Sequence, residues 1–264
     1  NPHLSTFDEF QRFKTHPTIA SVLEGGKRIS YGARGITKGG LNSLPKMTMP
    51  GGLLIGCDAG TLNFAKIKGT HTAMKSGLVA AETIAAALAN DDTSRELVEY
   101  ETAFMDSWAG AELKSSRNWG PALHKFGMYV GGAYNYLDQN FLGGRMPFSL
   151  TDDVPDHECL KRADATDAPA YPKPDGTLTF DKPSSVYLSN TNHEENQPVH
   201  LVLKNPAIPI EVNLPKWAEP ATRYCPVGVY EVVEKPNGPT FVINAQNCIH
   251  CKTCDIKDPS QNIT

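Results

Sequence analysis

The chain has 264 residues, of which 40% are hydrophobic and 20% are charged, and its formal net charge is -4 at pH 7. This length allows two domains with a sizeable core, and the charge provides no basic field that would attract nucleic acid. Because no run of about eighteen apolar residues occurs, we expect no helix that crosses a bilayer. The chain starts at Asn1 without a methionine, and we expect it to be part of a longer protein.

The first 118 residues predict a mixture of helices and strands. Residues 1–40 resemble the end of a larger domain, with a short helix over Asp8–Lys14 and a strand over Arg28–Gly32. The apolar run Leu53–Ile55 predicts a short buried parallel strand. An alanine-rich helix is expected from Gly69 to Asn90. A second helix is expected from Ser94 to Ser116, with its first residue as the N-cap.

Glycines and an acidic residue follow the predicted strand. Gly56 and Gly60 allow the backbone to turn sharply and approach a ligand closely. The segment Gly56-Cys-Asp-Ala-Gly60 resembles the second FAD-contacting motif of Rossmann-type flavoproteins, in which Asp58 would hydrogen-bond the ribityl chain. The next helix N-terminus would offer free N–H groups and a positive dipole to the flavin pyrimidine ring. The residues that would pass the ring are Asn63, Lys66, Gly69, Thr70 and His71.

This flavin motif is short, and a plain loop that leaves a core strand is the alternative interpretation. The companion Gly-x-Gly-x-x-Gly segment, which binds phosphate in such domains, does not occur in the 264 residues.

Residues 118–150 are rich in aromatic residues and glycine, but they are too polar to span a membrane. They could lie in the membrane interface, with Lys125 and Arg145 near the ends. Ordinary packing is the alternative. The apolar side chains of this segment are Phe126, Met128, Tyr129, Val130, Tyr134, Tyr136, Phe141 and Leu142.

The rest of the chain predicts an extended linker followed by short strands. Residues 151–185 are rich in proline and aspartate and include Cys159, which we expect to be a free thiol. Strands are predicted over His200–Leu203 and Ile210–Val212. A hairpin is predicted around Pro236–Pro239, where Asn-Gly favours a tight turn.

Four cysteines near the end of the sequence form the strongest chemical signal. Cys248, Cys251 and Cys254 have C-x₂-C-x₂-C spacing, and Cys225 is followed directly by Pro226. This is the ligand pattern of a [4Fe–4S] cluster in bacterial-ferredoxin-like domains. The predicted hairpin lies between the two segments and would bring the fourth thiolate to the other three.

Other interpretations of these cysteines fit less well. Structural zinc sites usually have paired C-x₂-C segments or Cys/His pairs. Cysteines this close in sequence are poorly placed to bridge each other, and six in 264 residues is not a disulfide-dense composition. His250 lies inside the run, but four thiolates already complete a site.

The chain is similar over essentially its whole length to the electron transfer flavoprotein–ubiquinone oxidoreductase family, with the motifs in the same order. We identify it as resembling the C-terminal portion of that family. The segments that carry the resemblance are Asn1-Pro-His-Leu-Ser, Glu24-Gly-Gly-Lys-Arg, Tyr31-Gly-Ala-Arg, Gly51-Gly-Leu-Leu-Ile-Gly-Cys, Lys66–Gly77, Thr191-Asn-His-Glu, Cys225-Pro-x-Gly-Val-Tyr and Cys248–Pro259.

The resemblance implies an α+β fold, which combines part of a Rossmann-type FAD domain with quinone-domain segments and a bacterial-ferredoxin-like [4Fe–4S] domain. The implied organisation is the end of the quinone-binding domain at 1–40, the C-terminal part of the FAD domain with following helices at 41–118, the interfacial segment and linker at 119–187, and the cluster domain at 188–264.

The implied activity is electron transfer from reduced electron transfer flavoprotein, through the cluster and FAD, to ubiquinone. The enzyme would be monotopic, on the mitochondrial inner membrane or the bacterial cytoplasmic membrane. Activity of this chain alone does not follow. One alternative is a non-catalytic ferredoxin-like carrier or docking module on a truncated flavoprotein. Another is a related flavoprotein reductase with a different acceptor, such as a menaquinone or a prenyl chain.

Three hydroxyl-bearing residues lie beside the cysteines in sequence: Thr222, Tyr224 and Thr253. We expect their hydroxyls to hydrogen-bond cluster or cysteine sulfur, which would stabilise the reduced state. The alternative is that each of them faces solvent.

Overall fold

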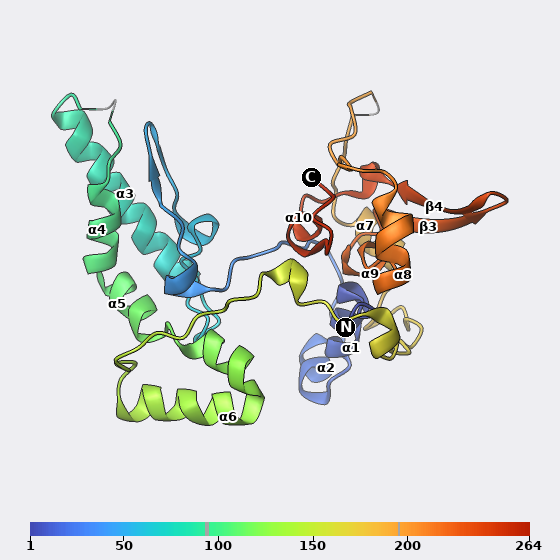
Figure 1. The fold of residues 1–264 in the computed structure, drawn as a ribbon, viewed down its shortest axis with the longest axis horizontal. Coiled ribbons are helices and arrows are strands. Elements are labelled where there is room, and N and C mark those ends of the chain that lie inside the picture. The colour runs from blue at the N-terminus through green and yellow to red at the C-terminus, as the bar shows by residue number, and fades with distance from the viewer. Residues whose placement is uncertain (93–94, 195) are drawn as a thin grey trace. The chain divides into compact units, whose positions relative to one another are not determined.

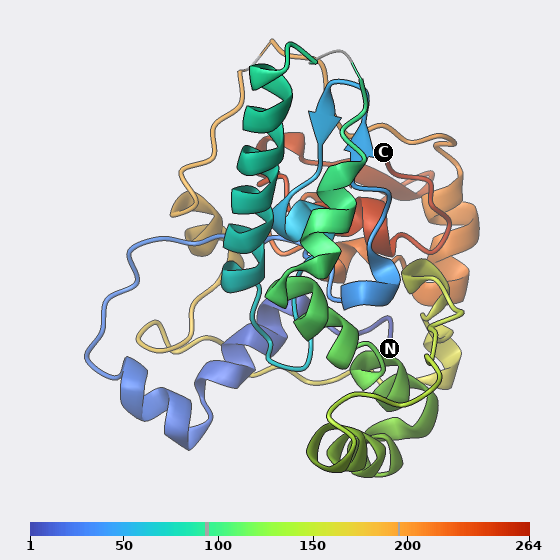
Figure 2. The same ribbon diagram turned by 90° about the vertical axis from the view of Figure 1, so that its left-hand side faces the viewer.

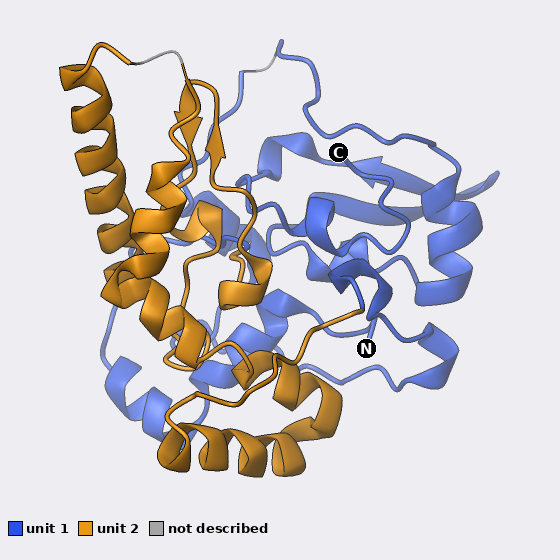
Figure 3. Ribbon diagram, turned by 60° about the vertical axis from the view of Figure 1, so that its left-hand side comes forward, with its two compact units in different colours: residues 1–35, 154–264 blue, residues 36–153 orange. Residues whose placement is uncertain are grey.

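A computed structural model describes residues 1–92, 95–194 and 196–264. These residues divide into two compact units, one made of residues 1–35 and 154–264 and the other of residues 36–153 (Figures 1 and 3). The first unit therefore contains both ends of the sequence, and its N-terminal segment packs with residues far along the chain. Among the described residues, no helix is both long and apolar enough to cross a membrane.

The unit of residues 36–153 is mainly helical, and Figure 2 shows α3 alongside α4 and α5. Its core contains the fully buried side chains of Tyr100, Phe104 and Leu113, which pack with Met47 and Val79. Its described elements are η1 (Gly40–Ser43), β1 (Thr48–Met49), β2 (Gly52–Leu53), η2 (Gly56–Ala59), α3 (Thr70–Ala89), α4 (Glu99–Asp106), α5 (Trp108–Ser115) and α6 (Trp119–Phe141).

The predicted parallel strand over Leu53–Ile55 is wrong. β2 pairs antiparallel with β1, so that Thr48 lies opposite Leu53, and the side chain of Ile55 is 46% exposed. A parallel strand requires a neighbour that runs in the same direction. Both named sheets among the described residues are two-stranded and antiparallel. Gly51, whose φ is +75°, lies in the turn that joins β1 to β2.

The helix predicted over Gly69–Asn90 is confirmed, but the second helix differs from the prediction. It begins at Glu99 and is divided at Ser107, whose backbone is extended (φ -74°, ψ 165°). The Ser107 hydroxyl donates to the Phe104 carbonyl oxygen at 2.6 Å, a local bond that competes with the helical pattern. The proposed N-cap, Ser94, lies outside the described residues.

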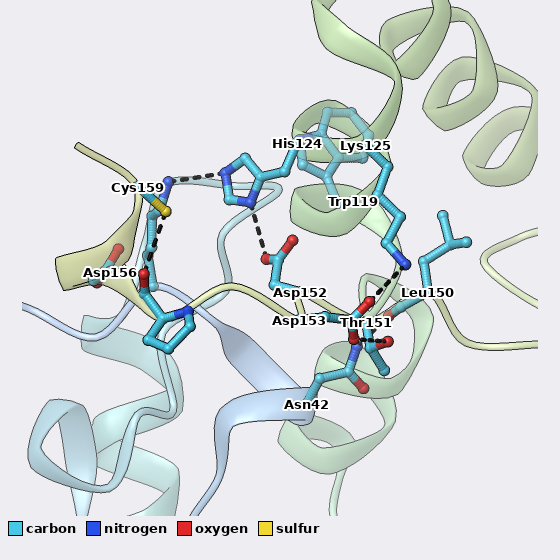
Figure 4. A network of polar contacts seen from close by, with 12 residues as sticks. Asn42, Trp119, His124, Lys125, Leu150, Thr151, Asp152, Asp153, Asp156 and Cys159 are labelled. Atoms are coloured by element: carbon cyan, nitrogen blue, oxygen red, sulfur yellow. Dashed lines mark hydrogen bonds and ion pairs between the residues drawn. The ribbon is translucent and has the colours of Figure 1, made fainter. Parts of the chain in front are cut away.

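The aromatic segment forms α6, which is kinked at Gly127 (φ 72°, ψ -179°). The loop that follows α6 is tied back to it by a hydrogen bond between His124 and Asp152 at 2.9 Å and an ion pair between Lys125 and Asp153 at 3.2 Å (Figure 4). The segment expected to lie in an interface is therefore a bent helix with a fastened return loop.

The unit of residues 1–35 and 154–264 consists of short elements around one hairpin. The predicted hairpin is confirmed: Tyr230 pairs with Ile243 and Lys235 with Gly238. The helix expected over Asp8–Lys14 is also present. The elements are α1 (Thr6–Lys14), α2 (Pro17–Leu23), η3 (Asp156–Glu158), η4 (Ala163–Ala165), α7 (Lys182–Tyr187), η5 (Pro209–Asn213), α8 (Leu214–Trp217), α9 (Ala221–Tyr224), β3 (Tyr230–Lys235), β4 (Gly238–Ile243), η6 (Ala245–Asn247) and α10 (Thr253–Lys257).

Three other predicted strands do not form as expected. Arg28–Gly32 is irregular rather than part of a sheet, and Ile210–Val212 belongs to the helical turn η5. Pro209 fixes a helical φ at the start of that turn, and three residues of alternation are too few to oppose it. Within His200–Leu203, only Leu203 makes a β-bridge, to Ile263.

The buried aromatic residues of α4 predict the stability of residues 36–153. Replacement of Phe104, which is 0% exposed, by alanine should lower the free energy of unfolding by about 3–5 kcal/mol. Met74→Ala is the matched control, because its side chain is 71% exposed and a change of less than about 0.5 kcal/mol is expected. Urea denaturation of both variants measures the difference, and similar losses would contradict the proposed core.

Candidate metal and cofactor sites

The four cysteines of the sequence pattern line one cavity. Cys225 directly follows α9, Cys248 follows η6, and Cys254 lies in α10. All four thiols are free, and the side chains of Cys225, Cys248 and Cys251 are only 5–8% exposed. Four close, unpaired and largely buried thiols are the donor set that a tetrahedral thiolate site requires.

The β3–β4 hairpin brings the two cysteine segments together. Its open end pairs Tyr230 with Ile243, and the Asn244 N–H donates to the Val229 carbonyl oxygen at 2.7 Å just beyond the pair. The chain therefore leaves Cys225 and returns beside it before reaching Cys248. This geometry agrees with the role predicted for the hairpin.

Backbone donors point at the sulfur atoms. The N–H of Val229 donates to Cys225 Sγ and the N–H of His250 donates to Cys248 Sγ, each at 3.4 Å. His250 has φ of +55°, an uncommon conformation for a residue with a side chain. Such N–H groups stabilise thiolates and metal-bound sulfur, so the residues present fit an iron–sulfur cluster.

The hydroxyl predictions have different outcomes. The position expected for Thr222 is wrong, because its hydroxyl donates to the Glu219 carbonyl oxygen at 2.9 Å. Thr253 lines the cavity, with its hydroxyl oxygen 3.3 Å from Cys251 Sγ. Tyr224 also lines the cavity and is 8% exposed.

Two tyrosine hydroxyls at the cavity lack a nitrogen or oxygen partner. They belong to Tyr224 and to Tyr230. Of these two residues, the sequence reasoning missed only Tyr230. Burial raises the pKa of both hydroxyls, and the nearby Cys254 thiol also raises that of Tyr230. Buried donors without partners usually indicate a missing acceptor, and the sulfur atoms of a cluster would supply one.

The N-terminal segment is part of the cysteine site. The Gly35 N–H donates to the Cys251 carbonyl oxygen at 2.7 Å, and the Tyr31 hydroxyl donates to the Pro226 carbonyl oxygen at 2.9 Å. Burial raises the pKa of Tyr31 to about 12, with further contributions from Cys225 and Cys251. A side chain at position 35 would meet the Cys251 carbonyl at 3.0 Å. Sequence reasoning missed this link because no local pattern connects residues so far apart.

A buried carboxyl group lies in the same unit. Glu219 is 1% exposed; its Oε1 accepts the Ala221 N–H at 3.1 Å, whereas its Oε2 has no hydrogen-bond partner. Burial, together with the charge of the fully buried Asp258, raises the pKa of Glu219 to about 7. Nothing in the sequence near Glu219 marks it as perturbed, because the shift depends on tertiary burial.

The flavin-like motif lies between β2 and α3, although the buried parallel strand expected before it does not form. η2 spans Gly56–Ala59 and packs on α3, where the Gly56 N–H donates to Ser76 Oγ at 2.8 Å. Gly56 has φ of +63°, and an added Cβ would lie 3.3 Å from Ala73 Cβ. Asp58 is exposed within η2, and α3 begins at Thr70 after Gly69, without a side-chain cap.

Three other candidate residues converge on Glu112 of α5. Its carboxylate accepts hydrogen bonds from Asn63 Nδ2 at 2.8 Å and Lys66 Nζ at 2.5 Å, and contacts His71 Nε2 at 2.6 Å. Partial burial opposes ionisation, but these partners outweigh it and lower the pKa of Glu112 to about 2. The His71 ring stacks on Trp108, with centroids 5.8 Å apart. Sequence reasoning missed Glu112, since it lies on a separate helix.

The raised pKa of Glu219 predicts a specific dependence of stability on pH. Its folded-state pKa, about 7, lies above the ordinary 4.5, so its contribution is complete below about pH 4.5 and is lost as the pH rises through 7. A shift of one pKa unit corresponds to about 1.36 kcal/mol. We therefore expect Glu219→Gln to reduce the pH-dependent loss in the free energy of unfolding by about 1–3 kcal/mol.

Denaturation at pH 5 and pH 8, at constant cluster content, measures this effect. The parent chain should lose more stability between the two pH values than Glu219→Gln does. Glu231→Gln, at an exposed position of β3, should behave like the parent chain. Equal pH dependence in all three proteins would contradict the assignment.

Comparisons with known proteins match two segments of the chain to family models. The family described as "Electron transfer flavoprotein-ubiquinone oxidoreductase, 4Fe-4S" matches residues 176–264, and "ETF-QO, ubiquinone-binding" matches residues 1–36. Both matches fall mainly in the unit that contains the four cysteines.

Curated relatives match the chain over its whole length. It is 65% identical to the electron transfer flavoprotein-ubiquinone oxidoreductase of Pseudomonas aeruginosa, covering 48% of that protein, and 51% identical to the mitochondrial protein of Homo sapiens, covering 44%. The chain thus spans about half the length of the curated relatives it matches. The chain is therefore similar over its whole length to about half of each of these electron transfer flavoprotein-ubiquinone oxidoreductases, and its four cysteines lie within the residues that match the 4Fe-4S family.

Proposed function

We propose that this chain supplies the cluster, and part of the flavin and quinone sites, of an oxidoreductase. The protein would pass electrons from reduced electron transfer flavoprotein through a [4Fe–4S] cluster and FAD to ubiquinone at a membrane surface. The observation that carries the proposal is the meeting of four free cysteines in one cavity lined by sulfur-directed donors. The names of the relatives supply the electron donor and acceptor.

Cys225, Cys248, Cys251 and Cys254 would hold the cluster, which exchanges single electrons when bound. The N–H groups that reach Cys225 and Cys248 would stabilise the added negative charge of the reduced state. Burial of the cysteines would limit access of water to the sulfur atoms. The tyrosine hydroxyls at the cavity would also donate to sulfur, and these hydrogen bonds would likewise stabilise the reduced state.

The residues of the flavin-like motif would form one side of an FAD site. FAD supplies chemistry in steps of one or two electrons when bound. Asp58 would hydrogen-bond the ribityl chain, and the first N–H groups of α3, at Gly69 and Thr70, would face the pyrimidine ring. Gly56 would keep the turn close to α3. The contacts of the Glu112 carboxylate would hold Asn63, Lys66 and His71 beside this helix N-terminus.

The bent helix α6 and its return loop would contact the membrane surface. Its exposed apolar side chains, 45–89% accessible, are Phe126, Met128, Tyr129, Val130, Tyr136, Leu137, Phe141 and Leu142, with Phe148 in the loop. Arg117 supports this arrangement, because its guanidinium donates to the carbonyl oxygens of Gly144, Met146 and Phe148. Apolar and tyrosine side chains on a surface helix suit the boundary between headgroups and acyl chains.

The cluster assignment predicts a clear difference between two cysteine variants. After anaerobic reconstitution with iron and sulfide, Cys225→Ser should lose most of the broad visible absorbance and the signal of the reduced cluster in electron paramagnetic resonance. Cys159→Ser should retain both, because Cys159 is exposed and lies outside the cavity. A cluster of normal yield and spectrum in Cys225→Ser would refute the assignment of this residue as a ligand.

The membrane assignment predicts weaker binding to vesicles when a charge is placed on α6. Met128→Asp should lower the partition coefficient for phosphatidylcholine–cardiolipin vesicles about tenfold or more, since burial of one apolar side chain contributes about 1.5–3 kcal/mol. Tyr187→Asp is the control, because its side chain is equally exposed (82%, against 79% for Met128) but lies on α7. Equal binding of the two variants in flotation assays would contradict the membrane contact.

A carrier or docking module is the second candidate function. The observation that favours it is that all four cysteines and the residues that tie them together lie in one compact unit. Titration with FAD distinguishes the two proposals. A reducible cluster together with bound flavin supports the oxidoreductase, whereas a reducible cluster in a chain that never binds flavin supports the module.

A further inference from the structure

Three histidines gather around Cys248 in the unit of residues 1–35 and 154–264. The ring centroids of His193, His200 and His250 are 4.8–5.3 Å apart in each pair. They come from separate segments of the chain, and neither the family pattern of four cysteines nor the proposed electron transfer uses them. This group of three histidines therefore requires its own explanation.

The three rings are not equivalent. His193 Nε2 contacts the Cys248 carbonyl oxygen at 2.8 Å, and its Nδ1 lies 3.4 Å from the Gln197 side-chain amide. Both nitrogens of His193 are thus engaged. By contrast, His200 Nε2 is buried and has no hydrogen-bond partner, and His250 is an exposed residue. The imidazoles of His200 and His250 therefore remain to bind a metal ion.

A cysteine sulfur completes a triangle with these two rings. One nitrogen of His200, one nitrogen of His250 and Cys248 Sγ all lie within 4.8 Å of one another. In a tetrahedral zinc site, Zn–N distances of about 2.0–2.1 Å and a Zn–S distance of about 2.3 Å place the ligand atoms roughly 3.4–3.6 Å apart. Rotation of the exposed His250 side chain can close this difference, and a water molecule would fill the fourth position.

We propose that His200, Cys248 and His250 form a second metal site, which binds Zn²⁺ when the cluster is absent. This inference rests on the proposed assignment of Cys248 as a cluster ligand. Binding of Zn²⁺ would displace the thiol proton of Cys248 to solvent and leave the other three cysteines unligated. Because both sites require the same sulfur, zinc and the cluster compete, and zinc would hinder cluster assembly.

The ligand types favour a borderline metal ion. Imidazole and thiolate together suit Zn²⁺ better than Mg²⁺ or Ca²⁺, which prefer oxygen ligands. The stacked His193 ring would hold its neighbours in place while its contact with the Cys248 carbonyl fixes the backbone of the shared ligand. Its role is positioning rather than ligation.

Two substitutions separate the sites, because each removes a ligand of only one of them. Zn²⁺ affinity of the reduced, cluster-free full chain is measured against a competing chelator, and Co²⁺ spectra report a thiolate-to-metal band. His200→Ala should weaken Zn²⁺ binding tenfold or more and leave cluster reconstitution intact. Cys225→Ser should abolish the cluster and keep the Zn²⁺ affinity. The control His157→Ala, at a histidine outside the group of His200, Cys248 and His250, should change neither.

Competition during reconstitution provides a second test. Zn²⁺ added during reconstitution should slow cluster formation in the parent chain, and His200→Ala should resist this inhibition about tenfold better. Equal inhibition of both proteins, or loss of Zn²⁺ affinity in Cys225→Ser as large as in His200→Ala, would place zinc in the four-cysteine set and overturn the proposal. If no cluster forms in the parent chain, the proposed function fails while the Zn²⁺ titration still tests the histidine site.

Discussion

The convergence of four thiols from two segments is the constraint on which the unit of residues 1–35 and 154–264 depends. The β3–β4 hairpin meets it, since its paired open end returns the chain from Cys225 to Cys248. Residues 1–35 pack in the same unit and contact this site. Their bonds to the carbonyls beside two cysteines, from Tyr31 and Gly35, close the backbone around the site.

The electrostatics of the site follow from placing several sulfur atoms in a buried cavity. Burial raises the pKa of Cys225 and Cys248, and hydrogen bonds from backbone N–H groups only partly oppose this effect. A bound metal would therefore be needed to keep the sulfurs of Cys225 and Cys248 deprotonated. Without metal, burial favours the neutral thiol of Cys248, so an ion that binds this sulfur together with a histidine must displace the thiol proton.

The sequence predicted the parts of the structure that depend on local spacing. The cysteine set, the Asn-Gly hairpin and the long helix α3 were all evident from short patterns, and each is present in the structure. The strand expected over Leu53–Ile55 failed because an apolar run does not reveal whether a parallel neighbour exists. The hydrogen bond expected from Thr222 to sulfur is absent because adjacency in sequence does not fix the direction of a side chain on a short helix.

The residues that sequence reasoning missed acquire their properties from tertiary contacts. Glu219 and Glu112 are chemically identical, yet their pKa values shift in opposite directions, to about 7 and about 2. Burial without a full set of partners favours the neutral carboxyl of Glu219, which avoids a negative charge close to the buried Asp258. Hydrogen bonds from Lys66, His71 and a buried amide instead keep Glu112 ionised. It thereby offsets the positive charge of Lys66 beside the N-terminus of α3.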